Sequence, residues 1–272
     1  ITVTVDASQT KVYGTAEPVF TYTVSPRLVG NDSFTGSLTR GAGENVGTYP
    51  IAQGSLSAGT NYTISYVGAD FSITKADQLI TWNQTLALGC DGDTTAILTA
   101  TSSSGLPVSY TSSNSAVATL SNGLLVTNNY GYATITGSQM GNTNYNAAPI
   151  VTLALSNSQP NLIRKQFEDI IFFDNSSNSF KSYSWYKNGV LVPGQTAQYY
   201  KENGGPLNGT YYAVATKLDG TLVNSCSLTL SPTVEEEYIK IVPNPVKPDA
   251  SYELLTNVTA SRLQNARIEV YS

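Results

Sequence analysis

The chain has 272 residues, a formal net charge of −5, no histidine and two cysteines, and only 12% of its residues are charged. Without histidine there is no Ser-His-Asp or Cys-His catalytic arrangement and no imidazole ligand for a metal. The acidic balance argues against a nucleic-acid partner, and no apolar run approaches the roughly 20 residues that span a bilayer. We therefore expect no nucleic-acid binding and no membrane insertion.

Both ends of the sequence alternate between apolar and polar residues. The first five residues read Ile-Thr-Val-Thr-Val with no signal peptide before them, and residues 267–271 alternate until the sequence stops. Such alternation is typical of strands. We expect the sequence to be a piece of a longer polypeptide.

Period-two alternation dominates the rest of the chain, as in residues 20–24, 62–66 and 151–155. Turn signals such as Asn122-Gly123 and Asn188-Gly189 separate the alternating runs. Short strands at this spacing predict sandwiches or small barrels. The predicted fold class is all-β, with tandem Ig-like or Greek-key β-sandwich domains in an elongated array.

One segment, residues 162–171, has apolar residues that could also be spaced on a helix. The run Ile170-Ile171-Phe172-Phe173 favours a buried strand instead, because no capping residue opens a helix there.

The distribution of charge suggests the domain boundaries. Residues 77–157 contain no lysine or arginine and only three acids, Asp77, Asp91 and Asp93, whereas cations occur on both sides. Polar stretches with a proline lie near residues 156–160 and 231–233. We predict domains at 1–76, 77–157 and 158–232, followed by a partial domain at 233–272.

Residues 1–76 resemble the MBG ("mostly bacterial Greek key") domain of bacterial surface proteins. The matching stretches are Lys11-Val12-Tyr13-Gly14, residues 18–22, 28–32, 47–51 and 61–64, and Phe71-Ser72-Ile73-Thr74-Lys75-Ala76. The resemblance covers nearly the whole segment and implies a small extracellular β domain.

Residues 77–157 resemble a bacterial Ig-like domain through residues 104–118, 131–136 and 141–148. Residues 158–232 resemble an Ig-like module of Bacteroidetes secreted proteins, in which Trp185 would be the core tryptophan. Residues 209–214 are similar to the strand with the tyrosine corner. The inter-sheet disulfide of antibody domains is absent from this segment because Cys226 is its only cysteine.

Residues 233–272 resemble the start of a type IX secretion C-terminal sorting domain, through Val242-Pro243-Asn244-Pro245 and residues 252–254 and 268–271. This resemblance implies a Bacteroidetes protein that contacts the secretion machinery through its last domain. It places the protein outside the cell or on the cell surface, attached to the outer membrane.

Sites for metals or cofactors are not expected. Asp91-Gly92-Asp93 is read as a turn, since a calcium site needs six to eight ligands. Cys90 and Cys226 fall in different predicted domains, and a linear string of domains does not favour a disulfide between them, so two free buried thiols are predicted. Thr94, in Asp93-Thr94-Thr95, fits a short O-glycosylation pattern of Bacteroidetes.

Catalytic residues are not expected either. Glu17, Asp32, Glu44 and Asp70 are the acids of the first segment that could form a carboxylate pair, but so small a domain has little room for a deep cleft. Gly41–Gly47 lacks the lysine of a phosphate loop and is read as a hairpin connection.

The tyrosines admit two interpretations, as ordinary half-buried strand residues or as an exposed platform for sugar rings or protein partners. The candidate platform comprises Tyr62, Tyr66, Tyr145, Tyr199 and Tyr200.

The function predicted from the sequence is a non-enzymatic extracellular spacer or stalk, monomeric and adhesin-like, that presents a distal functional domain. One alternative is a module that binds a glycan or a host surface protein through Tyr- and Asn-rich loops. A second alternative is an accessory C-terminal region of a secreted glycoside hydrolase or protease.

Overall fold

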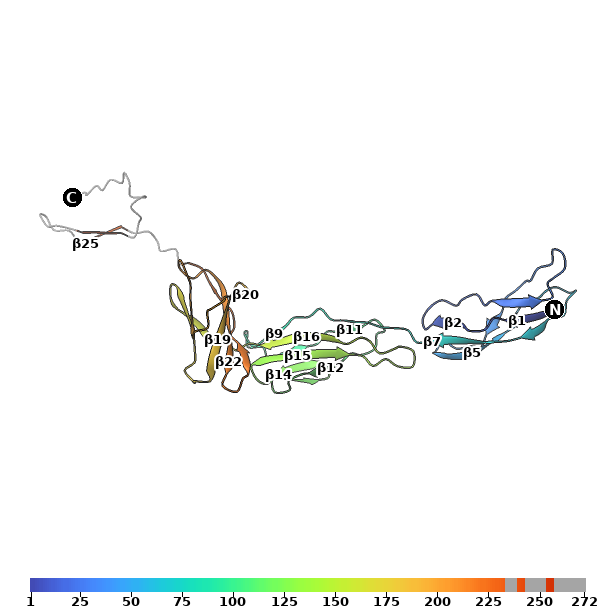
Figure 1. Cartoon of the computed structure of the whole chain (residues 1–272), viewed down its shortest axis with the longest axis horizontal. Helices are drawn as coiled ribbons and strands as arrows, with labels where there is room; N and C mark the ends of the chain where they lie inside the picture. The colour runs from blue at the N-terminus through green and yellow to red at the C-terminus, as the bar shows by residue number, and fades with distance from the viewer. Residues whose placement is uncertain (233–238, 243–252, 257–272) are drawn as a thin grey trace, which may run out of the picture.

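The computed structural model describes residues 1–232 with their side chains, and residues 239–242 and 253–256 as backbone. Three β modules follow one another along the length of the molecule, with the N-terminus at one far end (Figure 1). All regular elements in these residues are strands, so the all-β fold class and the elongated array are confirmed. No helix that could span a membrane occurs in the part of the chain described.

The first module (residues 1–76) packs two sheets, β3-β1-β6 and β2-β7-β5-β4, face to face. Its core comprises Val3, Val5, Phe20, Leu38, Ile51, Leu56, Phe71 and Ile73. Alternation explains this core: in β7 the apolar Phe71 and Ile73 point inward, while Ser72 between them is more exposed. The strands are β1 (Thr2–Val5), β2 (Gln9–Val12), β3 (Tyr22–Ser25), β4 (Thr39–Arg40), β5 (Gly47–Ala52), β6 (Ser65–Val67) and β7 (Asp70–Thr74).

The second module (residues 77–157) combines the sheet β12-β15-β16-β9 with the smaller sheets β10-β14-β13 and β11-β8. Its buried cluster runs from Ile80 to Leu155 and includes Trp82. The strands are β8 (Ile80–Thr81), β9 (Leu86–Leu88), β10 (Thr95–Ile97), β11 (Thr101–Ser102), β12 (Ser109–Ser112), β13 (Ala118–Ser121), β14 (Leu124–Thr127), β15 (Gly131–Ser138) and β16 (Val151–Asn157).

The third module (residues 158–232) packs the sheet β17-β18-β21 on a five-stranded sheet in which β20-β19-β22-β23 are neighbours and β24 also pairs with β22. The strands are β17 (Ile163–Phe167), β18 (Ile170–Phe173), β19 (Phe180–Lys187), β20 (Val190–Leu191), β21 (Tyr199–Lys201), β22 (Gly209–Lys217), β23 (Leu222–Asn224) and β24 (Leu228–Leu230). Residues 170–173 form a strand, so the strand interpretation of this segment is confirmed over the helical one.

Trp185 is the core tryptophan that the sequence predicts for the third module. It is completely buried, and its indole N–H donates to the carbonyl of Ala197 at 2.9 Å. Tyr211 is equally buried, and its hydroxyl accepts a hydrogen bond from the backbone N–H of Asn208, three residues upstream, at 2.9 Å. A tyrosine hydroxyl bonded to the backbone just upstream is the arrangement of a tyrosine corner.

Two hairpins have the turn chemistry that their sequence predicts. Asn122-Gly123 links β13 to β14 and Asn188-Gly189 links β19 to β20, and all four residues have positive φ. Positive φ at both central positions defines the turn that suits the twist of a hairpin. Gly41–Gly47 also connects paired strands, β4 and β5, as predicted.

Two strands follow the third module: β25 (Ile239–Val242) pairs antiparallel with β26 (Glu253–Thr256). The rest of the predicted sorting domain lies outside the described residues.

Candidate functional site

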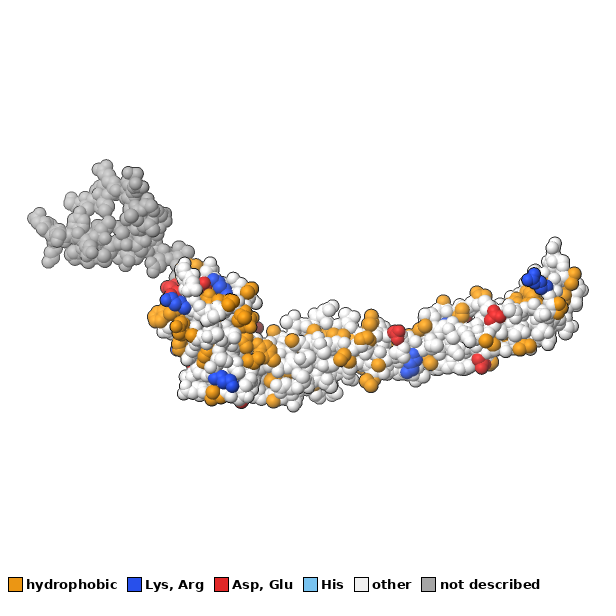
Figure 2. Space-filling model, in the orientation of Figure 1, with side chains coloured by type: hydrophobic (Ala, Val, Ile, Leu, Met, Phe, Trp, Pro, Cys, Tyr) orange, Lys and Arg blue, Asp and Glu red, His pale blue; other side chains and the backbone are white. Residues whose placement is uncertain are grey.

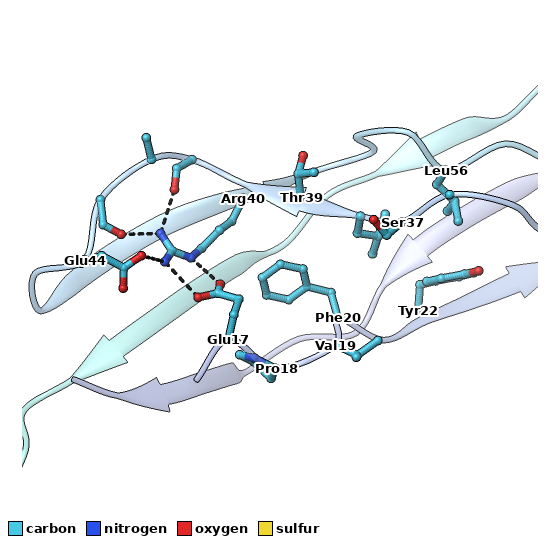
Figure 3. A pocket seen from close by; sticks show the side chains of 15 residues that line it. Glu17, Pro18, Val19, Phe20, Tyr22, Ser37, Thr39, Arg40, Glu44 and Leu56 are labelled. Carbon is cyan, nitrogen blue, oxygen red and sulfur yellow. Dashed lines mark hydrogen bonds and ion pairs between the residues drawn. The ribbon is translucent and has the colours of Figure 1, made fainter. Parts of the chain in front are cut away.

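The first module carries a cluster of four charged side chains on the face of the β2-β7-β5-β4 sheet. The Arg40 guanidinium donates to both carboxylate oxygens of Glu17, at 2.6 Å and 3.0 Å, and to Glu44 at 2.6 Å. Lys11, on the strand at the opposite edge of the sheet, places its Nζ 2.8 Å from each of the two glutamates. Two cations and two anions therefore neutralise one another. Figure 3 shows Arg40 between Glu17 and Glu44.

Arg40 is the centre of this cluster. Its side chain is only 8% exposed and lies over the rings of Tyr49 and Phe71, 5.0 Å and 5.5 Å from their centroids. It also donates to the carbonyl oxygens of Gly41 and Gly43, at 2.9 Å and 2.5 Å. Arg40 therefore fixes the loop between β4 and β5.

The neighbouring cations lower the pKa values of the two glutamates. The hydrogen bond from Arg40 lowers the pKa of Glu17 to about 2, and the hydrogen bond from Lys11 lowers the pKa of Glu44. A general acid that works near neutral pH needs a raised pKa. This carboxylate pair is brought together, as a glycosidase pair would be, but it has the electrostatics of a structural ion pair.

A groove of about 830 Å³ lies beside the cluster, between the segment Glu17–Phe20 and residues 36–44 (Figure 3). Phe20 is buried in it, whereas Val19 on its rim is 89% exposed. The lining residues include no histidine or cysteine. The groove has the size of a small-molecule pocket but contains no activated nucleophile.

The junction between the first and second modules is braced by backbone hydrogen bonds. The N–H of Ala76 donates to the carbonyl of Asn144 at 3.0 Å, and the N–H of Asn146 donates to the carbonyl of Ala76 at 2.9 Å. These bonds form a parallel bridge between Ala76 and Tyr145, and Lys75 adds a bond to the carbonyl of Asn142 at 2.7 Å. The linker is thus paired with a loop of the second module.

Side chains extend this brace into the body of the first module. Asn144 Oδ1 accepts from the N–H of Val46, and Asn144 Nδ2 donates to Asn45 Oδ1, both at 2.9 Å. The ring of Tyr145 meets Tyr13 edge-on, with centroids 5.3 Å apart. The two modules are therefore joined by more than the covalent linker.

The loop that makes these contacts, residues 141–146, is itself well supported; we call it the bracket loop. The side-chain oxygen of Asn142 accepts from the N–H groups of Asn144 and Tyr145, at 2.8 Å and 2.9 Å. A Cβ at Gly141, where φ is +75°, would lie 2.3 Å from the carbonyl oxygen of Tyr145. Only glycine fits this close approach.

The junction between the second and third modules contains a disulfide between Cys90 and Cys226, with Cα atoms 5.5 Å apart. The prediction of two free thiols is therefore wrong. Cys90 follows β9 at the end of the second module that faces the third, and Cys226 lies between β23 and β24 at the facing end of the third module. The two cysteines meet because the second and third modules contact each other where they join, although the cysteines are 136 positions apart in the sequence.

Hydrogen bonds surround this disulfide. The N–H of Gln159 donates to the carbonyl of Asn224 at 2.8 Å, and the N–H of Cys226 donates to the carbonyl of Gln159 at 3.1 Å. The side chain of Asn224 bonds the hydroxyls of Tyr132 and Ser156 of the second module. Burial, followed by the nearby Tyr186 and Tyr212 of the third module, raises the pKa of Tyr132 to about 12.

Residues 89–94 form a turn beside the disulfide, as predicted for Asp91-Gly92-Asp93. The N–H of Gly89 donates to the backbone and side-chain oxygens of Asp93, at 3.2 Å and 3.0 Å. Thr94 is exposed, and its carbonyl accepts from the N–H of Thr127 at 2.8 Å. Its exposure is compatible with the predicted O-glycosylation, which stays a prediction.

The five candidate platform tyrosines do not form one surface. Tyr62 and Tyr66 lie in the first module and bond Asp32 and the carbonyl of Ile51, both at 2.7 Å. Tyr145 lies at the first junction. In the third module Tyr199 is 45% exposed, but Tyr200 is only 3% exposed and packs against Trp185 and Tyr211 in the core. For Tyr200 the platform prediction is wrong, because alternation along β21 turns it inward.

Tyr199 belongs instead to an exposed apolar patch on the β17-β18-β21 sheet. A shallow hollow of about 440 Å³ is lined by Arg164, Gln166, Phe167, Ile170, Phe172 and Tyr199. Phe167 is 60% exposed. Hydrophobic side chains are also more frequent on the visible face of the third module than on that of the second (Figure 2).

The sequence did not predict the ion-pair cluster around Arg40, nor the contact of the bracket loop with the first module. The charged residues of the cluster are spread over positions 11 to 44, and strand pairing brings them together. Only Arg40 and Glu44 are close enough in sequence to have suggested a pair. The Gly-Asn-Thr-Asn-Tyr-Asn run of the bracket loop is distinctive in the sequence, but nothing in it indicates a contact with the preceding module.

A comparison with sequence models of protein families identifies the first module. Residues 1–72 match the MBG domain, YGX type. The resemblance proposed for this segment is confirmed, and domains of this type are typical of bacterial extracellular proteins. No curated protein matches the chain. The MBG match ends at residue 72, so the Ig-like and sorting-domain resemblances stay predictions.

The MBG module contains one Tyr-Gly pair, Tyr13-Gly14, followed by Thr15. Gly14 has φ +80°, and the N–H of Thr15 returns to the carbonyl of Val12 at 3.1 Å, so the pair makes a tight turn after β2. This turn presents Tyr13 to Tyr145. The Tyr-Gly turn of this MBG module is thus part of the first junction.

Proposed function

We propose that the chain is a non-enzymatic extracellular spacer of a bacterial surface or secreted protein, which holds a distal functional part at a fixed distance. The observation that carries the proposal is the pair of braced junctions between modules that follow one another along the molecule. Each module has a hydrophobic core of its own, and each junction adds contacts that limit bending. A disulfide suits the oxidising conditions outside the cell.

The chemistry of the MBG groove supports a role without catalysis. Its carboxylates are held by Arg40 and Lys11, and their pKa values are lowered. Charges fixed in this way stabilise the loop between β4 and β5 rather than activate water or a substrate.

Small-angle X-ray scattering of the full chain in solution tests the spacer. Three modules, each about 30 Å or more in length, predict a maximum dimension on the order of 100 Å or more for residues 1–232. The expected pair-distance distribution is that of an elongated particle with a bend at the second junction, with a narrow peak near the module width and a long tail.

The matched control is the same measurement after a protease has cut the chain at a site introduced between the first two modules. A distribution for the intact chain as short as that of a compact 272-residue protein would contradict the spacer, because the modules would then fold back on one another.

A second candidate function is the binding of a glycan by the β17-β18-β21 patch. Exposed aromatic rings beside a guanidinium and an amide suit the apolar face and the hydroxyls of a sugar ring. The patch combines Phe167, Phe172 and Tyr199 with Arg164 and Gln166.

A glycan array tests this second function. Saturable binding that Tyr199→Ala or Phe167→Ala abolishes, and that Tyr130→Ala in the second module leaves unchanged, would support it. The absence of any saturable binding by the wild-type chain would contradict it.

A further inference from the structure

The Cys90–Cys226 disulfide changes the path by which tension crosses the molecule. The chain has only two cysteines and both are in this bond, so no other intramolecular pairing exists. A pull on the two ends follows the shortest covalent route, which runs from the N-terminus to Cys90, across the disulfide and on from Cys226. Residues 91–225 lie on a closed loop beside that route.

We propose that this disulfide is a covalent bypass that removes most of the second and third modules from the line of tension. The first module, by contrast, lies entirely on the line. The MBG module is then the extensible element of the spacer, and the second and third modules stay folded under load. The biological meaning of this bypass rests on the proposed spacer function, but the stretching experiment that tests the bypass does not depend on that function.

The position of the loaded segment supports the bypass. Residues 77–89 run along the second module from the first junction to the disulfide, through β8 and β9 (Figure 1). Thirteen residues extend to at most about 45 Å. Because part of this segment is already in strands, tension can lengthen it only slightly.

The loaded segment is also fastened along its length. β9 pairs in parallel with β16, and Leu86 and Leu88 of β9 are buried in the core of the second module. Past the disulfide, β24 pairs with β22 of the third module. Tension enters the loaded segment through the backbone at residue 77 and leaves it through the Cys90–Cys226 disulfide. The other strands of the two modules therefore carry no tension and are not pulled apart.

Single-molecule stretching of the full chain, with handles at residues 1 and 272, tests the bypass. Apart from the tail beyond residue 226, the oxidised wild type should release only the first module, roughly 250–270 Å of extended chain. Dithiothreitol should add roughly 450–490 Å, which corresponds to the 136 positions between the cysteines. The double variant Cys90→Ser/Cys226→Ser should release this additional length without reductant. The tail beyond residue 226 carries tension in the oxidised and in the reduced protein, so it contributes nothing to the difference between their released lengths.

A second attachment point separates the bypass from simple mechanical strength. With one handle at residue 1 and the other on a tag inserted in the exposed Asn122-Gly123 turn, the line of tension enters the loop. The second module should then unfold with the disulfide intact, at forces at which pulling on the ends leaves it folded.

Three results would overturn the inference. The first is release of the additional length by the oxidised wild type without reductant. The second is a second module that resists pulling through residue 122 as firmly as pulling through the ends. The third is alkylation of both cysteines before reduction, detected by mass. A compact particle in the scattering experiment would contradict the spacer function and leave these stretching results unaffected.

Discussion

The side-chain oxygen of Asn144 accepts a hydrogen bond from the backbone N–H of Val46, 98 positions earlier in the chain and in a different module. The same side chain donates to Asn45, so one amide bonds two consecutive residues across the first junction. No covalent cross-link supports this junction, and its geometry depends on such bonds.

We predict that Asn144→Ala loosens the first junction without unfolding either module. Two hydrogen bonds of about 0.5–1.5 kcal/mol each are lost, while the backbone bridge at Ala76 remains. The scattering distribution should broaden toward shorter maximum dimensions, with an unchanged denaturation midpoint. Asn208→Ala, at an exposed position of the third module, is the control, and identical scattering from the two variants would refute the prediction.

Arg40→Ala should destabilise the first module by about 2–3 kcal/mol, measured by urea denaturation. Loss of one partner of a fully buried ion pair costs about 3–5 kcal/mol. The expected loss is smaller here because the side chain of Glu17 is 39% exposed. Lys165→Ala removes the more exposed ion pair with Glu168 and should cost less than about 1 kcal/mol. Equal costs for the two variants would show that Arg40 does not organise the module.

The first module should lose stability in acid. In the folded state the pKa of Glu17 is lowered from 4.5 to about 2, so its charged form stabilises the fold above pH 4.5. This stabilisation declines as the pH falls from 4.5 toward 2. Glu17→Gln should therefore be less stable than wild type at pH 7, and the two proteins should converge near pH 2 in urea denaturation. A constant difference across this range would mean that the Glu17 charge is not responsible.

Gly89→Ala should prevent the disulfide from closing fully. A Cβ at this position would lie 2.3 Å from the carbonyl oxygen of Ser158, and the residue has φ +94°. Displacement of the neighbouring Cys90 should leave a fraction of free thiol, quantified by alkylation before reduction. At Gly92, where φ is +80°, a Cβ meets nothing within 4 Å, so Gly92→Ala shares the backbone strain without the clash. Equal fractions of free thiol in the two variants would show that the clash with Ser158 is not the cause.

Strand alternation made much of the fold predictable. The burial of Trp185 and the strand at 170–173 follow from local pattern, because a strand that packs on one face needs apolar residues at every second position. The hairpin turns were equally local, since Asn-Gly pairs accept positive φ at little cost.

Contacts between modules were not predictable in this way. Cys90 and Cys226 come together because each ends up at the shared surface of two modules, and no local pattern encodes that position. The Arg40 cluster likewise depends on the order of strands in the sheet, which places Lys11 and Arg40 on opposite edges with their charges meeting over its face. The sequence periodicity specifies which side of a strand is buried but not which strands become neighbours.

The second module has no lysine or arginine, and apart from the disulfide and the bond from Lys75, its junctions are held by amides, hydroxyls and backbone groups. Dissolved ions weaken attraction between exposed charges but have little effect on bonds between neutral groups. The angles between the modules, and with them the overall dimensions of the chain, should therefore be the same in fresh water and in brine.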